Sequence, residues 1–487
     1  MRFQVLKSAF RRRWFPTKPW LRVFASLALT TVLWGCAGEI PEEEPGSLNV
    51  ILVSIDTLRP DHLGCYGYDK PTSPSIDAFC EDSLVFERAY AQAPSTLLSH
   101  TALFTSLIPQ HHGASHIRRI PLSEDVPTLT TLLSDAGYAT ASFNGGSQLA
   151  ADFGLDQGFD VYESLPFEVR GLEGAPFQWS VDQGLGWIDQ QRGGEGSAPF
   201  FLFLHSYEVH HPYTPEARWL ELFDTGYDGE LPDSISIQLL EQVYNRQRIL
   251  DDADLDHIRA TYDAEIRSMD EAFGALMRGL EERGLLEETI LVFTSDHGEE
   301  FGEHGHVGWH SHTLYNELLR VPLMMRFPGS TVPGSGEHLP SRGVRVGTRV
   351  RSIDIVPTLL EALGLGQWAL DQGFRPQGQS LQLLAASAMQ ENGVGDLDAM
   401  AFWDTPDPAV VHESLASRHW KYHDGELYDL SKDPGEQNDL SAERPDVVEG
   451  LRRQLDHLVA SREAVVGETL QLDEATERQL EALGYTP

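Results

Sequence analysis

Acidic and imidazole side chains stand directly after runs of apolar residues in this sequence. Asp56 follows "NVILVSI", His205 follows "FFLFL" with His210 just beyond it, and Asp296 and His297 follow "TILVF" with two residues between. Carboxylate oxygens and imidazole nitrogens are ligands that divalent transition metals take in proteins. We therefore expect Asp56, Asp296 and His297 to hold one divalent ion, if the fold brings them together.

The apolar runs themselves are typical of β-strands buried on both faces, because they are continuous and rich in β-branched residues. Runs of this kind cover Leu48–Asp56, Tyr138–Phe143, Pro199–His205, Glu288–Gly298 and Val321–Gly329. Helical patterns lie between them and end on a glycine, as helix C-termini favour, at Gly137, Gly284 and Gly364. This alternation predicts an α/β fold with a central, mainly parallel sheet flanked by helices. Ligands bind at the carboxyl ends of such strands, where the metal-binding side chains would meet.

Composition limits the classes of partner. The chain has 487 residues, which suggests two or three domains, and its 41% hydrophobic and 23% charged residues are typical of a globular protein. The net charge of −38 disfavours nucleic acid and anionic membrane surfaces as partners. An anionic substrate would need a local positive site. The oligomeric state is not indicated.

The N-terminus has the pattern of a bacterial export signal. A basic segment is followed by the short apolar run Val23–Cys36, whose end "LWGC" resembles a lipobox. Residues 1–35 are then a signal peptide, Cys36 carries the lipid and residues 36–47 form a tether, which predicts an envelope lipoprotein of the periplasm or outer membrane. "RRRWF" hints at a twin-arginine route, and an uncleaved N-terminal anchor is the alternative.

Two domains are expected after the tether. Residues 48–390 would form the large α/β domain, and residues 391–487 a small α+β subdomain with short strands in Ser414–Leu440 and a helix at Pro445–Arg462. One disulfide between Cys65 and Cys80 is compatible with an oxidising compartment, but their spacing alone does not establish it.

Seven motifs occur in order and together resemble the sulfatase family of the alkaline phosphatase superfamily. They are "NVILVSIDTLRPDHLGCYGY", "TSPSIDAF", "PSTLLSHTALFTSLIPQHHG", "FLHSYEVHHPYTP", "TSDHGEEFGEHG", "SIDIVPTLLEALG" and "KYHDGELYDLSKDPGEQNDL". The resemblance covers about Leu48 to Leu440. It implies a large α/β domain with a small C-terminal sheet subdomain, and a metal-dependent hydrolase of sulfuric or phosphoric esters.

The resemblance places Thr96 at the position of the nucleophile. Family sulfatases carry a formylglycine there, made from Cys or Ser in the pattern C/S-x-P-x-R; here Leu98 replaces the proline and His100 the arginine. The modification is therefore not expected. The set Asp56, Thr96, Asp296 and His297 is similar to the threonine-using branch of the superfamily, in which one metal ion activates the hydroxyl. Ser95 or Ser99 would be the nucleophile if the alignment slips.

Histidines supply the remaining candidate catalytic groups. His210 and His310 are similar in position to family residues that bind the substrate, and one of them could protonate the leaving oxygen or stabilise charge on the transferred group. His100 would supply a pH-dependent cation. His205 or His211 competes with His210, and His312 with His310. The other histidines are expected to line the cleft or face solvent (His304, His306) or to be structural (His111, His112).

The sequence therefore predicts an exported, lipid-anchored ester hydrolase with a covalent intermediate on Thr96 and one divalent ion (Mn, Ca or Zn). Its substrate would be a small-molecule or glycan sulfate or phosphate ester. Two alternatives stay open. One is a phosphoryl-group transferase that builds envelope polymers, and the other is a non-catalytic surface lipoprotein on the same fold. A transferase would form new products when acceptor alcohols are added. A non-catalytic protein could lack the metal ion that the hydrolase requires.

Overall fold

The computed structural model describes residues 48–166, 176–192, 198–224, 226–329, 342–382, 384, 395–405, 407, 410–465, 467 and 469–485. Residues Glu44–Pro487 form one compact unit. The predicted signal peptide, the lipidated Cys36 and the tether lie outside the described residues. Among the helices of the described part, none is both long enough and apolar enough to cross a bilayer.

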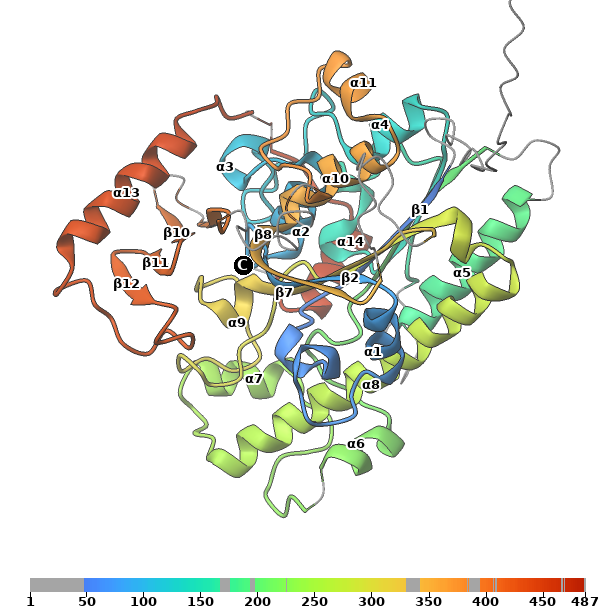
Figure 1. Ribbon diagram of the computed structural model, residues 1–487. Coiled ribbons are helices and arrows are strands. Elements are labelled where there is room, and N and C mark those ends of the chain that lie inside the picture. Colours follow the sequence, from blue (N-terminus) through green and yellow to red (C-terminus); the bar gives the residue numbers. More distant parts are fainter. Residues whose placement is uncertain are drawn as a thin grey trace, which may run out of the picture. The chain divides into compact units, whose positions relative to one another are not determined.

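An eight-stranded sheet forms the centre of the molecule (Figure 1), with the strand order β4-β3-β5-β1-β6-β7-β2-β8. Its described pairings are parallel except those of β7, which runs antiparallel to β6 and to β2. The sheet is thus mainly parallel, as predicted. The strands are β1 Asn49–Ile55, β2 Leu84–Tyr90, β3 Ala139–Asn144, β4 Val161–Ser164, β5 Phe200–Ser206, β6 Thr289–Thr294, β7 Arg320–Arg326 and β8 Val344–Arg351.

Both faces of the sheet are covered by helices. Val50 and Leu52 of β1 belong to one apolar cluster, while Ile51 and Val53 belong to another, because successive side chains of a strand point to opposite faces. The first cluster receives side chains from α2 (Thr96–Thr105), α4 (Leu129–Asp135) and α10 (Ile355–Ala362). The second receives side chains from α1 (Pro74–Glu81), α5 (Pro176–Arg192) and α8 (Asp252–Glu282), which lie across the sheet from α10 in Figure 1.

The strands after residue 398 form a separate antiparallel sheet in the order β12-β11-β10-β9. Its strands are β9 Ala399–Asp404, β10 Val411–Ser417, β11 Trp420–His423 and β12 Glu426–Asp429, and α13 (Pro445–Val459) packs on it. The fold class is therefore confirmed. The domain boundary near residue 390 stays a prediction, since residues 385–394 lie outside the described residues.

The helix α14 (Glu474–Ala482) does not stay with the small sheet. In Figure 1 it lies near the large sheet and apart from α13. Its Leu480 belongs to the same apolar cluster as Val50, and Gln479 accepts a hydrogen bond from the backbone N–H of Ser147 over 2.7 Å. The last described residues, up to Tyr485, are therefore part of the large α/β core.

A disulfide and a buried ion pair connect elements of the fold. A disulfide joins Cys65, in the 3-10 turn Gly64–Tyr66, to Cys80 of α1, the pairing that the sequence left open. Lys421 of β11 pairs with Glu436 over 2.7 Å, and both side chains are fully buried. The second carboxylate oxygen of Glu436 accepts a hydrogen bond from the backbone N–H of Asn316, which ties the small sheet to α9 (Asn316–Leu319), the short helix before β7.

Candidate active site

The first residue of α2 places a hydroxyl at the carboxyl end of β1. Thr96 follows Ser95, whose extended backbone caps the helix, and its Oγ1 donates a hydrogen bond to Asp56 Oδ2 over 3.0 Å. Gln148 fixes this turn because its Oε1 accepts from the backbone N–H of Leu97 over 2.9 Å. A helix N-terminus also favours a negatively charged group in front of it. Thr96 is therefore well placed to meet an anionic ester.

The two serines that compete with Thr96 are engaged elsewhere. Ser99 Oγ donates to the backbone oxygen of Asp296 over 2.7 Å, and Ser95 Oγ lies against Gln148 and His116 at 3.2 and 3.3 Å. Thr96 is the one of the three whose hydroxyl bonds a carboxylate in the described structure. This geometry favours Thr96 as the nucleophile, which stays a prediction.

Asp56, Asp296 and His297 meet at one edge of the sheet because β1 and β6 are parallel neighbours. One ligand atom from each lies within 4.8 Å of the others, and all three side chains are buried. His297 Nε2 lies 3.5 Å from Asp296 Oδ2 and 3.9 Å from Asp56 Oδ1. The structure thus brings together three of the four residues predicted to hold a metal ion, and the fourth, Thr96, bonds Asp56.

Three atoms of this group have no hydrogen-bond partner in the described part of the chain. They are Asp56 Oδ1, Asp296 Oδ2 and His297 Nε2. His297 Nδ1 donates to the backbone oxygen of Gly298 over 2.9 Å, so Nε2 is the ring nitrogen available to an ion. Burial, against the opposing effect of His297, raises the pKa of Asp56 to about 6. Two carboxylate oxygens and one imidazole nitrogen without partners suit a divalent cation, so the residues fit the predicted ion.

His205 and His100 lie beneath these ligands. His205 Nε2 lies 3.4 Å from Asp56 Oδ2, so the competing histidine also borders the metal group. Both ring nitrogens of His100 are occupied, with Nδ1 bonding the backbone oxygen of Thr96 at 2.8 Å and Nε2 bonding Ser54 Oγ at 2.9 Å. Burial lowers the pKa of His100 to about 4, so the ring is neutral at neutral pH rather than the cation expected there. Its contacts fit a role in holding the first turn of α2.

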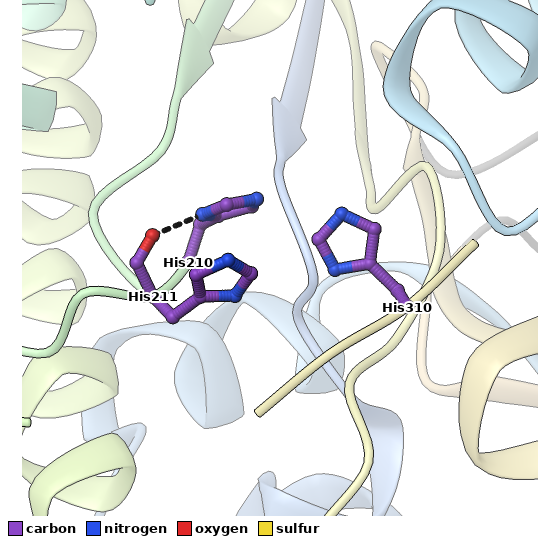
Figure 2. Close-up of side chains that lie close together, drawn as sticks. All are labelled: His210, His211 and His310. Atoms are coloured by element: carbon purple, nitrogen blue, oxygen red, sulfur yellow. Dashed lines mark hydrogen bonds between the residues drawn. The ribbon is translucent and has the colours of Figure 1, made fainter. Parts of the chain in front are cut away.

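A second group of histidines, drawn in Figure 2, lies next to His297, since the ring centroids of His297 and His310 are 4.5 Å apart. His210 and His211 follow β5, and His310 faces them from the loop between β6 and β7. Glu299 joins two of the rings, since its carboxylate oxygens accept from His211 Nδ1 at 3.1 Å and His310 Nδ1 at 3.3 Å. His210 Nδ1 donates to the backbone oxygen of His211. The sequence analysis did not single out Glu299, because the motif "TSDHGEEFGEHG" also contains Glu300 and Glu303 and does not distinguish among them.

The protonation of this group follows from those contacts. Burial lowers the pKa of His310 to about 3 and that of His210 well below its ordinary value. Both rings are therefore neutral at neutral pH, and each presents a lone pair at Nε2, which accepts a proton rather than donating one.

His304, His306, His312 and His111 make side-chain contacts outside this group. His312 Nε2 pairs with Glu300 at 2.8 Å beside the ring of His306, and His304 stacks on Tyr315. His111 bonds Gln377 and the backbone oxygen of Val459, a structural role as predicted. His310 rather than His312 thus borders the site.

Tyr485, the third residue after α14, enters the site and was missed by the sequence reasoning. Its hydroxyl lies 3.4 Å from Thr96 Oγ1, 2.9 Å from His210 Nε2 and 2.8 Å from His310 Nε2. A cavity of about 670 Å³ lies beside it, lined among others by His116, Trp309 and Trp403. The tyrosine lies beyond the seven motifs, so only the folded chain shows its place.

Comparison with known proteins gives one family. The family model described as Sulfatase matches residues 48–365. Arylsulfatase K of Xenopus laevis is 25% identical over 469 residues, which cover 84% of this chain and 82% of that protein. Arylsulfatase A of Homo sapiens is 27% identical over 477 residues, with 86% and 89% covered.

Two solved structures share the fold. BT4656 in complex with its substrate D-glucosamine-2-N,6-O-disulfate superposes with a TM-score of 0.66 at 19% identity, covering 85% of this chain and 97% of that one. The phosphonate monoester hydrolase of Agrobacterium radiobacter superposes with a TM-score of 0.64 at 21% identity, covering 88% and 98%.

Proposed function

Because the chain belongs to the sulfatase family and is an ester hydrolase of that family, we propose that it cleaves sulfate or phosphate esters with Thr96 as nucleophile. The observation that carries the proposal is the hydrogen bond from Thr96 Oγ1 to Asp56 Oδ2, beside three ligand atoms without partners in the described chain. A hydroxyl in that position is next to the group of atoms best suited to hold an ion.

A divalent cation (Mn, Ca or Zn) held by Asp56, Thr96, Asp296 and His297 would favour the alkoxide form of the threonine and neutralise charge on the transferred group. Asp56 Oδ2 already accepts the hydrogen bond of Thr96, so it can take the proton when Oγ1 attacks phosphorus or sulfur. The bond from that atom to the ester oxygen breaks, and the leaving alcohol takes a proton from solvent. The phosphoryl or sulfuryl group is then esterified to Thr96.

Water completes the reaction by attacking the same atom. The neutral rings of His210 and His310 present Nε2 lone pairs toward the site, so either can accept the proton of the attacking water. This role differs from the protonation of the leaving group expected from the sequence, since both Nδ1–H groups are already donated to other acceptors. The Thr96 oxygen leaves and recovers its proton from Asp56.

The proposed substrate is a small-molecule or glycan ester. BT4656 binds a sulfated amino sugar, which makes sulfated sugars one class to test, and the phosphonate monoester hydrolase makes phosphorus esters another. The test is a panel of aryl and sugar sulfates, phosphate monoesters and phosphate diesters, each assayed with manganese, calcium or zinc. Absence of turnover on the whole panel with every metal would contradict the proposal. An intact-mass measurement of the peptide 92–113 should show unmodified threonine.

We further propose that the protein is exported and anchored by lipid on Cys36. The basic leader and "LWGC" support this. Metabolic labelling with a palmitate analogue should mark the full-length protein and not a Cys36→Ala variant. Label that persists in the variant would contradict lipidation at Cys36.

A further inference from the structure

We propose that Tyr485 occupies the position of the substrate's reacting group, so that the α14 segment (residues 469–485) must withdraw before an ester reaches Thr96. The proposal rests on the proposed role of Thr96. Reacting atoms must approach to about 3–3.5 Å before a bond forms. The phenol oxygen lies 3.4 Å from Thr96 Oγ1, which is the distance at which phosphorus or sulfur would have to stand. The two cannot share that place.

The phenol oxygen of Tyr485 also lies next to His210 and His310, the two candidate bases. It lies 2.9 Å from His210 Nε2 and 2.8 Å from His310 Nε2, so no attacking water fits between the rings while it stays. Trp309 packs beside Gly484, where an added Cβ would come within 3.3 Å of the indole. The tyrosine therefore excludes both reactants of the proposed mechanism at once.

The hydroxyl of Tyr485 cannot satisfy both of the histidine nitrogens that it contacts. Both histidines donate through Nδ1, to the backbone oxygen of His211 and to Glu299, so each neutral ring offers only an acceptor at Nε2. A phenol has one hydrogen and can satisfy only one of these acceptors. A water molecule has two hydrogens and can satisfy both acceptors, so water can replace the tyrosine without losing a well-matched contact.

The α14 segment is held at a few points along its length. Gln479 accepts from the backbone N–H of Ser147, Thr476 Oγ1 donates to Asp152 Oδ2 over 2.6 Å, and Glu477 pairs with Arg119 at 3.2 Å between half-exposed side chains. Exposed ion pairs contribute little to stability. Leu480 is the main apolar anchor.

The cavity of about 670 Å³ lies against this segment. Tyr485, Leu480 and Leu472 line it together with Trp309 and Trp403, but Thr96 does not. Tyr485 thus separates the cavity from the nucleophile. Withdrawal of the segment would join the two spaces.

The test uses the metal-loaded, full-length protein and compares Tyr485→Ala and Tyr485→Phe with wild type. If the tyrosine competes with substrate, only molecules with the α14 segment withdrawn can bind it. The apparent Kd is then the intrinsic Kd divided by the fraction of such molecules. We expect KM to fall about 10-fold in Tyr485→Ala and about 3-fold in Tyr485→Phe, with kcat within about 2-fold. Tyr422→Phe, which removes one hydroxyl from the small sheet, is the matched control and should leave KM unchanged. A lower kcat at unchanged KM in Tyr485→Phe would show a catalytic role instead and overturn the proposal.

Binding of inorganic phosphate, measured by calorimetry, tests the same point without turnover. The Kd of phosphate should fall by the same factors in the two Tyr485 variants. It should also fall in Gln479→Ala, which loosens the α14 segment at a point that does not contact Thr96. An unchanged Kd in all three overturns the occlusion even if Thr96→Ala abolishes activity. Full activity of Thr96→Ala, together with tighter phosphate binding in Tyr485→Ala, would instead reject the nucleophile and retain the occlusion.

Discussion

Thr96 and Asp56 are 40 positions apart in the chain, yet the threonine hydroxyl donates to the carboxylate across 3.0 Å at the edge of the sheet. The strand β1 ends just before Asp56, and α2 begins at Thr96. This contact predicts that the hydroxyl is indispensable. Thr96→Ala should lower kcat/KM at least about 1,000-fold, equivalent to about 4 kcal/mol of transition-state stabilisation, while Thr96→Ser retains activity within about 10-fold.

Steady-state kinetics on the best ester of the panel would measure both changes. Ser95→Ala is the matched control, since its hydroxyl bonds Gln148 and not a carboxylate, and it should stay within about 10-fold of wild type. Mass spectrometry of a rapidly quenched reaction should find the phosphoryl or sulfuryl group on the peptide 92–113. Thr96→Ala with wild-type kinetics would reject the nucleophile.

The carboxylates of Asp56 and Asp296 predict that metal removal destabilises the protein. Burial and the Asp56 carboxylate raise the pKa of Asp296, because two like charges lie in one buried group. Asp296→Asn removes one charge, and an amide oxygen at Oδ1 can still accept from the backbone N–H groups of Thr57 and His297. After chelation the variant should be more stable than wild type by about 1–3 kcal/mol.

With metal restored, wild type should become more stable than Asp296→Asn, because an ion that binds the folded state stabilises wild type more than the variant. Thermal unfolding with and without chelator, together with metal analysis, measures both states. Asp263→Asn is the contrasting control. This buried carboxylate pairs with His62 and Lys70, so its loss should destabilise the metal-loaded and the chelated protein equally. Equal metal content in wild type and Asp296→Asn would argue against Asp296 as a ligand.

Glu208 predicts a loss of stability as the pH rises. Burial, opposed by hydrogen bonds from Ser268 and the backbone of Phe177, raises the pKa of its carboxyl from the ordinary 4.5 to about 7. The folded state therefore keeps its proton to higher pH than the unfolded state, so stability falls as pH rises from about 4.5 to about 7. Glu208→Gln removes this dependence and can still accept from the Phe177 N–H.

The variant should match wild type near pH 4.5 and exceed it by about 2–3 kcal/mol at pH 8. Urea unfolding at a series of pH values gives the difference directly. A constant difference across the series would mean that Glu208 does not titrate as described.

The buried pair Lys421–Glu436 predicts a strong effect of removing one charge. Lys421→Met leaves the carboxylate of Glu436 buried without its cation, which should cost about 3–5 kcal/mol. The double variant Lys421→Met, Glu436→Gln should recover much of this loss, because the amide is neutral and its oxygen can still accept from the Asn316 N–H. Chemical denaturation would compare the three proteins, and a double variant no more stable than the single one would contradict this account.

Continuous apolar runs made β1, β3, β5, β6 and β7 predictable from the sequence, to within a few residues at their ends. The strands β2 and β8 were missed because Glu87 and Arg88 interrupt the first, and Arg345 and Arg349 the second. Pairing with neighbouring strands of the sheet stabilises β2 and β8 despite these charged side chains. The helix α8 begins at Asp252, where Asp251 and Asp254 form a capping box.

The candidate site was predictable where it depends on strand ends and not where it depends on tertiary packing. Asp56, Asp296 and His297 directly follow buried strands, so the rule for parallel sheets brings them together. Glu299 and Tyr485 have no such signal, because loop packing and the path of the α14 segment decide their places. The neutral state of His100 also depends on burial that the sequence does not show.

The bridge between Cys65 and Cys80 closes a loop across 15 positions of the chain. A covalent loop of this size restricts the unfolded chain, which in the chain-entropy model contributes about 3 kcal/mol of stability. Protein produced in a reducing cytosol would lack this contribution and carry two thiols, whereas protein matured under oxidising conditions would not. Thiol titration of the two preparations, set beside their urea midpoints, would therefore separate a difference in oxidation history from any difference in metal loading.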